Sequence, residues 1–211
     1  MSQKNILKGK LYCLTAEKFS RGRSNLEVVK EMLAAGVKII QYREKDKEMG
    51  EKYEECLQLR AMTKEADATF IINDDVDLAL AVEADGVHIG QKDLPVKVVR
   101  NLLKPEMIIG LSTHSPDQAQ AAVKAGADYI GVGPIFATNT KKDVCAPVGL
   151  EYLSYVVNNL EIPHVAIGGI KEHNVEQVIK VGAETVAMVT EIVGAEDIEK
   201  KTRKVKYLLG E

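Results

Sequence analysis

Short apolar runs rich in valine and isoleucine recur along the chain, and segments with helical spacing separate them. Most of the runs are continuously apolar rather than alternating, which is typical of parallel strands covered on both faces. Between the first two runs, apolar residues return at helical intervals, as at Leu26, Val29 and Leu33. This alternation predicts a parallel α/β sheet. The expected strands are residues 11–15, 37–42, 69–73, 86–90, 108–112, 129–133, 163–167 and 185–189.

The number of predicted strands chooses among parallel architectures. Spread over eight strand–helix units, the 211 residues leave about 26 per unit, enough for a short strand, a three-turn helix and two short loops. Because a (β/α)₈ barrel needs ~200 residues at its smallest, we predict an α/β fold of the (β/α)₈ TIM-barrel type, as a single domain over residues 1–211. The alternative is an open, doubly wound sheet, which usually carries a glycine-rich turn where this chain reads TAEKFSRGRSN.

An internal repeat supports the barrel. A small residue, a glycine and then a strand recur in AAGVKIIQY, EADGVHIG, KAGADYIGVG and KVGAETVAMV. We interpret each as the end of a helix, with a glycine for the left-handed cap, followed directly by a strand.

Composition and charge narrow the class of protein. Apolar residues make up 45% of the chain and charged residues 28%, as in ordinary globular proteins. The formal charge of −3 excludes a broad nucleic-acid-binding surface, but not a local basic pocket for a phosphorylated small molecule. No apolar run approaches the ~20 residues of a membrane span, and Cys13, Cys56 and Cys145 are too widely spaced for a disulfide or zinc framework. We expect a soluble cytoplasmic protein that binds phosphorylated small molecules, with neither nucleic acid nor membrane as a partner; a homo-oligomer stays open.

Polar residues are concentrated after the predicted strands, where the loops of (β/α)₈ barrels form the active site. Gln41, Arg43 and Lys45 occupy alternate positions at the end of strand 2, so all three should point toward the barrel mouth. The intervening Tyr42 and Glu44 should point away. An amide and two cations would then converge on the mouth, whereas the alternative is that the charges are solvated in a loop.

Asp74 and Asp93 come at the ends of the neighbouring strands 3 and 4. Two carboxylates are the smallest protein contribution to a Mg²⁺ site, because that ion keeps several waters and takes further ligands from phosphate oxygens. The alternative is helix capping, a role open to Asp75 and Asp93. The few histidines are too scattered for a zinc or iron centre, and His88, inside a strand, is expected to be a packing residue.

Later loops are candidates for a second anion site. The loop of residues 137–143 follows strand 6 and carries hydroxyls and lysines, a combination that is also common in plain loops. Gly168-Gly169 follows strand 7 and precedes a helix expected to start near Glu172, which would free backbone N–H groups for an anion. Val189-Thr190 after strand 8 would supply the opposite edge, a recurrent phosphate position in this class of barrel.

Taken together, these motifs resemble the thiamine-phosphate synthase family, also called thiamine-phosphate pyrophosphorylases. The resemblance runs from about Leu11 to Ala195 and rests on an ordered set of segments, each of them weak alone. They are QYREK (41–45), NDD (73–75), DGVHIGQKD (85–93), GLSTHS (110–115), GVGPIFATNTKKD (131–143), AIGGI (166–170) and GAETVAMVT (182–190). The resemblance implies an enzyme that condenses a pyrimidine diphosphate with a thiazole phosphate, giving thiamine phosphate and pyrophosphate.

The resemblance also assigns roles to residues. It implies that the pyrimidine diphosphate is bound by Gln41, Tyr42, Arg43, Glu44, Lys45, Asn73, Ser112 and Lys141. Asp74 and Asp93 match the ligands of one Mg²⁺ ion. The thiazole-phosphate positions are Thr138, Asn139, Thr140, Gly169, Val189 and Thr190, the last being Ser more often in the family. The implied reaction is dissociative, and the catalytic cations Arg43, Lys45 and Lys141 stabilise the departing diphosphate together with the metal.

Three other functions stay open. A thiazole tautomerase of a sister family should not need the diphosphate-binding residues that this chain has. Another phosphate-binding barrel isomerase or epimerase would need a paired acid and base, which we do not find in the sequence. A non-catalytic sensor of thiamine-pathway phosphates need not keep Asp74 or Lys141. Release of pyrophosphate from both substrates with Mg²⁺ separates the synthase from all three.

Overall fold

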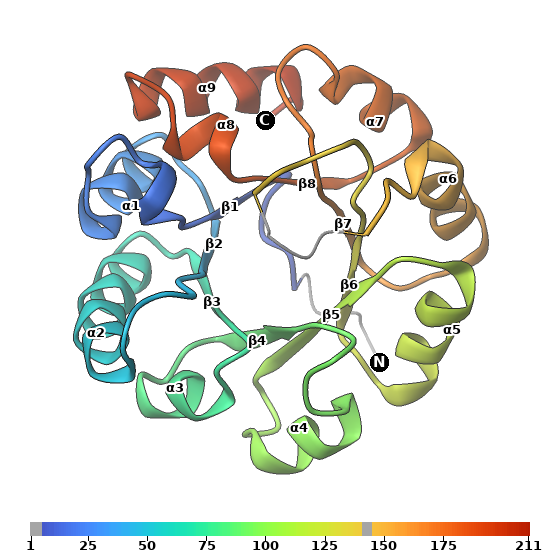
Figure 1. The fold of residues 1–211 in the computed structure, drawn as a ribbon, viewed down its shortest axis with the longest axis horizontal. Helices are drawn as coiled ribbons and strands as arrows, with labels where there is room; N and C mark the ends of the chain where they lie inside the picture. Colours follow the sequence, from blue (N-terminus) through green and yellow to red (C-terminus); the bar gives the residue numbers. More distant parts are fainter. Residues whose placement is uncertain (1–5, 141–144) are drawn as a thin grey trace.

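The computed structural model describes residues 6–140 and 145–211. Its strands form one closed parallel barrel in chain order, and β8 pairs with β1 to complete the ring. Figure 1 looks down this ring of strands, with the helices arranged around it. The predicted (β/α)₈ TIM barrel is confirmed.

The strands lie within or next to the predicted ranges. They are β1 Leu11–Leu14, β2 Ile39–Tyr42, β3 Thr69–Asn73, β4 Gly86–Ile89, β5 Ile108–Thr113, β6 Tyr129–Val132, β7 His164–Ala166 and β8 Thr185–Met188. Strand β2 begins at Ile39 rather than at residue 37, because the N–H of Val37 donates to the carbonyl of Met32 at 3.1 Å. Val37 therefore belongs to the turn that follows the preceding helix.

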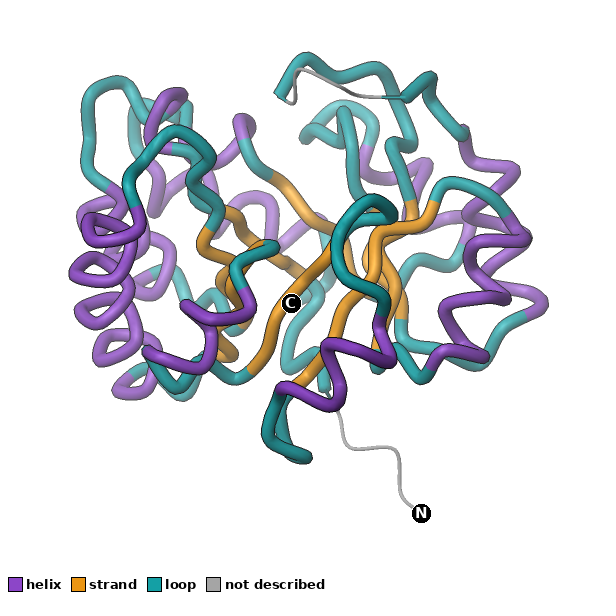
Figure 2. Tube along the Cα trace, turned by 60° about the horizontal axis from the view of Figure 1, so that its bottom comes forward, coloured by secondary structure: helices purple, strands orange, loops and turns teal. Residues whose placement is uncertain are grey.

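The helices lie outside the strands, as the tube in Figure 2 also shows. They are the 3₁₀ helix η1 Glu17–Phe19 and α1 Asn25–Ala34, α2 Met49–Glu65, α3 Val76–Ala81, α4 Val96–Leu102, α5 Pro116–Ala125, α6 Gly149–Asn159, α7 Val175–Val181, α8 Thr190–Val193 and α9 Ile198–Leu208. Helix α1 begins with a capping box, in which the side chains of Ser24 and Glu27 each accept the other's backbone N–H. In the ranges that the structure describes, no helix combines the length and apolar character needed to cross a membrane.

The predicted glycine caps are present in three of the four repeats. Gly36, Gly126 and Gly182 have φ values of 80°, 85° and 108° after α1, α5 and α7. In the remaining repeat the prediction is wrong, because Gly86 is the first residue of β4 and Glu83 takes the left-handed conformation, with φ of 51°. Gly86 is needed for close strand packing instead, since a Cβ there would lie 2.3 Å from the backbone oxygen of the facing β5 strand.

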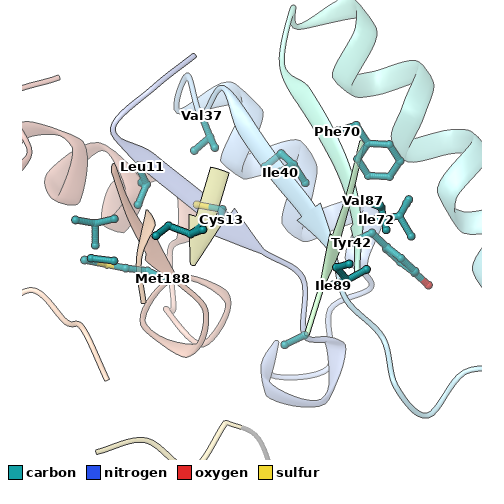
Figure 3. Packing of buried hydrophobic residues seen from close by; sticks show 14 of the residues in the cluster. Leu11, Cys13, Val37, Ile40, Tyr42, Phe70, Ile72, Val87, Ile89 and Met188 are labelled. Carbon is teal, nitrogen blue, oxygen red and sulfur yellow. The ribbon is translucent and has the colours of Figure 1, made fainter. Parts of the chain in front are cut away.

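The alternation of side chains along each strand separates two apolar layers. Leu11 and Cys13 of β1 face the helices and belong to the outer layer, part of which Figure 3 shows. Tyr12 and Leu14 face the barrel lumen. The inner layer consists of Tyr12, Leu14, Ile39, Ile71, Tyr129, Val165 and Ala187. Each large side chain buried in these layers stabilises the fold by roughly 1.5–3 kcal/mol. Because both layers consist largely of strand residues, their packing fixes the positions of the strand ends that form the site.

Two aspartates at the amino-terminal edge of the barrel hold neighbouring strands and a helix together by equivalent interactions. Asp85, just before β4, accepts a hydrogen bond from the backbone N–H of Phe70 in β3 at 2.7 Å. Its two carboxylate oxygens also accept hydrogen bonds from the two terminal nitrogens of Arg60 in α2, at 2.9 and 3.0 Å. Asp128, just before β6, accepts the N–H of Ile109 in β5 at 2.7 Å and pairs with an arginine of α4. Each carboxylate joins two neighbouring strands to the helix that precedes them. The strand–helix units therefore also repeat in the way their amino-terminal ends are held together.

We expect Asp85→Asn and Asp128→Asn each to lower the free energy of unfolding by about 1–2 kcal/mol, because a neutral amide replaces a charged acceptor. Urea unfolding followed by circular dichroism measures this change. Asp67→Asn is the matched control: Asp67 pairs with Lys8 at the exposed surface, and its φ of 48° is one that Asn tolerates. Equal destabilisation of all three variants would contradict a special role for the two edge aspartates.

Candidate active site

The alternation predicted for the end of β2 is present in the structure. Gln41 is 3% exposed and donates from Nε2 to the hydroxyl of Tyr12 inside the barrel, at 2.8 Å. Tyr42 points outward and donates its hydroxyl hydrogen to Glu55 of α2 at 2.7 Å. Glu44 accepts a backbone N–H of η1 at 2.9 Å. The side chains of Tyr42 and Glu44 thus point away from the mouth, as the alternation predicts, so a contact of these two residues with the pyrimidine diphosphate would come from their backbone.

Arg43 and Lys45 bring two positive charges to the mouth. The backbone of Arg43 is held by its N–H, which donates to the hydroxyl of Thr15 at 2.8 Å. Burial lowers the pKa of its guanidinium, and the nearby carboxylate of Asp74 opposes this shift; arginine stays charged in proteins. Lys45 forms an ion pair with the same Asp74 carboxylate. Both cations therefore interact with Asp74, at the place where an anionic ligand would enter.

Asp74 and Asp93 face one another beyond the ends of β3 and β4. Asp74 has a φ of 63° and donates its N–H to the carbonyl of His88 at 2.9 Å. Asp93 accepts the N–H of Gly90 at 2.7 Å. Burial raises the pKa of Asp93, and the neighbouring carboxylate of Asp74 raises it further. Two carboxylates in this arrangement repel each other unless a proton or a cation lies with them, and carboxylate oxygens are the ligands that Mg²⁺ prefers.

The helix-cap alternative does not hold for Asp93. The cap position of α4 is Pro95, so Asp93 lies before it. Asp75 does occupy the cap position of α3, but its carboxylate binds Lys52 of α2 at 2.8 Å. Among the described residues, no cluster of three or more Asp, Glu, His or Cys could hold a metal ion. A cation bound by Asp74 and Asp93 would therefore complete its coordination with water and phosphate oxygens, as Mg²⁺ commonly does.

A continuous chain of hydrogen bonds crosses the barrel lumen next to these charges. It starts at Gln41, whose partner Tyr12 has its hydroxyl 2.9 Å from that of Tyr129. The Tyr129 hydroxyl lies 2.9 Å from Nδ1 of His88, and Nε2 of His88 lies 2.9 Å from Oγ of Ser112. Burial raises the pKa of both phenols, so each keeps its proton. The expectation that His88 is a packing residue is wrong, because both of its ring nitrogens have polar partners.

Gly110 makes room for this chain of hydrogen bonds. A Cβ at this position of β5 would lie 2.2 Å from Cζ of Tyr129 and 2.4 Å from Nδ1 of His88. Any larger residue would push the two rings apart. Sequence reasoning missed Tyr12, Tyr129 and His88 as a group. A signal was present, because polar-tipped side chains at inward-facing strand positions need partners inside the barrel.

The loop after β6 lies against the loop after β7. The N–H groups of residues 135–136 donate to the carbonyls of residues 167–168, both at 2.9 Å. Gly169 has a φ of 63°, and a Cβ there would lie 2.5 Å from the carbonyl oxygen of Ala137. Gly169 is thus required for this close packing, whatever its backbone N–H binds. The contact brings the hydroxyl-bearing segment 138–140 next to Gly169.

The remaining residues expected at the thiazole phosphate lie on the loops after β6 and β8. The hydroxyls of Thr138 and Thr140 are 3.1 Å apart, and Asn139 between them is exposed. Val189 occupies the cap position of α8, and Thr190 is its first residue. Because β8 pairs with β7, this segment leaves the barrel beside the loop that carries the two glycines.

The helix after β7 begins at Val175 rather than near Glu172, because Asn174 closes a turn: its side chain accepts the N–H of Lys171 at 2.7 Å and donates to a carbonyl at 3.0 Å. Lys141, the third expected catalytic cation, lies outside the described residues.

Known proteins match this chain over nearly its full length. The family model TMP-TENI, described as thiamine monophosphate synthase, matches residues 11–192. A thiamine-phosphate synthase of Pelotomaculum thermopropionicum is 62% identical over 204 residues, which are 97% of this chain and 94% of that protein. One of Caldicellulosiruptor saccharolyticus is 55% identical over 201 residues, covering 95% of this chain and 91% of that protein.

Solved structures agree with the sequence matches. The structure of a thiamine phosphate pyrophosphorylase from Pyrococcus furiosus is similar with a TM-score of 0.90 and 39% identity, covering 98% of each chain. A 3-hexulose-6-phosphate synthase, at a TM-score of 0.65 and 18% identity, shares the fold alone. The family model covers every strand of the barrel and both aspartates at its mouth. This chain therefore belongs to the thiamine monophosphate synthase family.

Proposed function

We propose that this chain condenses a pyrimidine diphosphate with a thiazole phosphate, producing thiamine phosphate and pyrophosphate. The observation that carries the proposal is the pair of facing carboxylates, Asp74 and Asp93, with the cations Arg43 and Lys45 at the same mouth. Relatives named thiamine-phosphate synthase, at 62% and 55% identity, support the same reaction.

The residues at the mouth are suited to a diphosphate. Arg43 offers a planar fork that matches phosphate oxygens, and Lys45 offers a compact ammonium group. Lys45 is paired with Asp74 in the structure. A cation held by Asp74 and Asp93 would neutralise Asp74 in place of Lys45, which would leave Lys45 available to a phosphate oxygen. When bound, Mg²⁺ supplies neutralisation of the charge on the diphosphate.

The proposed reaction is dissociative. The bond between the pyrimidine methylene carbon and the diphosphate oxygen breaks first, and the nitrogen of the thiazole then attacks the resulting cation. Such a reaction needs neither a nucleophilic side chain nor a general base. It needs stabilisation of the negative charge that grows on the departing oxygens, which Arg43 and Lys45 provide from positions held by the barrel. We propose Lys141 as a third cation.

The thiazole phosphate is proposed to bind between the loops after β6, β7 and β8. The candidate contacts are Thr138, Asn139, Thr140, Gly169, Val189 and Thr190. The contact between the first two loops supports this site, because it places hydroxyls beside the turn at Gly169. A phosphate held there would keep the thiazole nitrogen close to the reacting carbon, which lowers the entropic barrier to bond formation.

One assay separates this function from its alternatives. A thiazole tautomerase or a non-catalytic sensor would not release pyrophosphate from the two substrates with Mg²⁺. We expect equal amounts of pyrophosphate and thiamine phosphate, and formation of neither would overturn the proposal. We also propose a reducing, cytoplasmic location, supported by three free cysteines, of which Cys145 is exposed.

Asp74→Ala should lower kcat on the order of 100-fold, because it removes half of the protein's contribution to the cation site. The fold should persist, since Asp74 lies at a strand end outside both apolar layers. Asp77→Ala, which removes an exposed carboxylate of α3, is the matched control and should keep its activity. Steady-state pyrophosphate release measures both variants, and full wild-type activity in excess chelator would contradict the metal site.

Arg43→Lys should lower kcat/KM for the pyrimidine diphosphate about tenfold, the equivalent of ~1.4 kcal/mol, because lysine keeps the charge but loses the planar fork. Glu44→Gln should change kcat/KM much less, since its amide oxygen can still accept the N–H of η1. Both are compared by pyrophosphate release at saturating Mg²⁺. If Glu44→Gln is the more damaging change, the assignment of Arg43 to the diphosphate is wrong.

Gly169→Ala should raise KM for the thiazole phosphate while leaving KM for the pyrimidine diphosphate nearly unchanged. Its Cβ would push against Phe136 and Ala137 and so displace the loop that leads to residues 138–140. Gly126→Ala isolates the cost of the left-handed backbone, because Gly126 also has a positive φ of 85°, but a Cβ added there would meet no atom within 4 Å. Equal effects on both KM values would contradict two separate anchors.

A further inference from the structure

The chain of hydrogen bonds through the lumen can run in two directions, and the need to keep its buried hydroxyl hydrogens bonded selects one of them. The Nε2 atom of Gln41 can only donate, so the oxygen of Tyr12 accepts from it at 2.8 Å. Tyr12 has a single hydroxyl hydrogen, and the oxygen of Tyr129, 2.9 Å away, is its only acceptor among the hydrogen bonds of the described residues. This buried hydrogen stays bonded only if Tyr12 donates to Tyr129.

The donors and acceptors at the other end of the hydrogen-bonded chain belong to Tyr129, His88 and Ser112. In this direction Tyr129 donates its only hydrogen to Nδ1 of His88, 2.9 Å away, and that nitrogen carries no proton. The ring is then protonated at Nε2, and this N–H donates to Oγ of Ser112 at 2.9 Å. The hydroxyl hydrogen of Ser112 is not used in that bond and can be donated to a ligand at the mouth.

We propose that Tyr12, Tyr129 and His88 are positioning residues that set Ser112 as a hydrogen-bond donor to the pyrimidine diphosphate. Only the identity of this ligand rests on the proposed function, because the direction of the chain belongs to the protein alone. Phosphate oxygens and pyrimidine ring nitrogens are acceptors, so Ser112 can bind them only as a donor. In the reverse direction Ser112 would donate to His88 and present lone pairs to an acceptor.

Because the hydrogen-bonded chain is buried, all of its hydrogen bonds must reverse their direction together. Tyr12 and Tyr129 are 2% and 0% exposed, and Gly110 leaves space that just fits the contact between Tyr129 and His88. Reversing a single link would set two donors against each other in a region of low dielectric, where an unpaired polar group is costly. The amide of Gln41 at one end therefore controls the hydroxyl of Ser112 at the other.

Nitrogen-15 NMR of the imidazole rings tests the direction in the ligand-free protein. We expect the neutral Nε2–H tautomer of His88 in the wild type, and the Nδ1–H tautomer would overturn the proposal. In Gln41→Glu, measured at alkaline pH where the new carboxylate is ionised, position 41 can only accept. The chain should then reverse, and the proton of His88 should move to Nδ1.

Asn73→Asp is the matched control for the added charge. It makes the same amide-to-carboxylate change at the end of β3, in register with His88 on β4, but Asn73 is not a link of the chain. His88 should keep the Nε2–H tautomer in this variant. The proposal is overturned if the tautomer is unchanged in Gln41→Glu, or if Asn73→Asp shifts it equally.

A double-mutant cycle tests whether the chain acts through Ser112. Tyr129→Phe should lower kcat/KM for the pyrimidine diphosphate about tenfold alone, and should have no further effect in the Ser112→Ala background. Tyr152→Phe, which removes a buried hydroxyl bound to Thr113 at 2.6 Å on the outer face, should leave kcat/KM unchanged. Equal losses from Tyr129→Phe in both backgrounds overturn the positioning role. A wild type that converts neither substrate refutes the proposed function, while the NMR result still decides the direction.

Discussion

Closure of the sheet is the interaction on which the rest of the molecule depends. The parallel pairing of β8 with β1, with Leu11 opposite Val186 and Cys13 opposite Met188, leaves the barrel without an edge strand. Closure gives each strand residue one of two surroundings, the lumen or the helical layer. Because every pairing is parallel, all carboxyl ends meet at one end of the barrel. Residues as distant in sequence as Gln41 and Thr190 can therefore serve one site.

The two ends of the barrel use carboxylates in opposite ways. At the amino-terminal edge, Asp85 and Asp128 each accept a backbone N–H and an arginine, so their charges are compensated within the protein. At the mouth, Asp74 and Asp93 face each other, and Asp74 takes a left-handed backbone conformation. Lys45 pairs with Asp74 there, and a left-handed backbone at a residue other than glycine is the kind of local strain that proteins retain where a ligand must bind.

The lumen combines an apolar side with a polar one. Ile39, Ile71 and Val165 fill part of it, whereas the hydroxyls of two tyrosines, with an imidazole, form the hydrogen-bonded chain. Buried polar groups are tolerated there because each link of the chain has a partner. The same network that satisfies these groups ends at Gln41 and Ser112, next to the charged mouth. Packing and polarity of the lumen are therefore tied to the site.

The sequence by itself determined the barrel, because eight apolar runs with intervening helical periods record which faces each element buries. It also determined the family, through an ordered set of motifs, and the facing of Gln41 and Tyr42, through the two-residue period of a strand. Only the tertiary structure decided that Asp93 faces Asp74, that Asn174 delays α7, and that Tyr12, Tyr129 and His88 form one chain. These contacts join strands such as β1 and β6 across a closed lumen. Local periodicity shows which face a side chain takes, but the side chain that it meets there depends on the register and closure of the whole barrel.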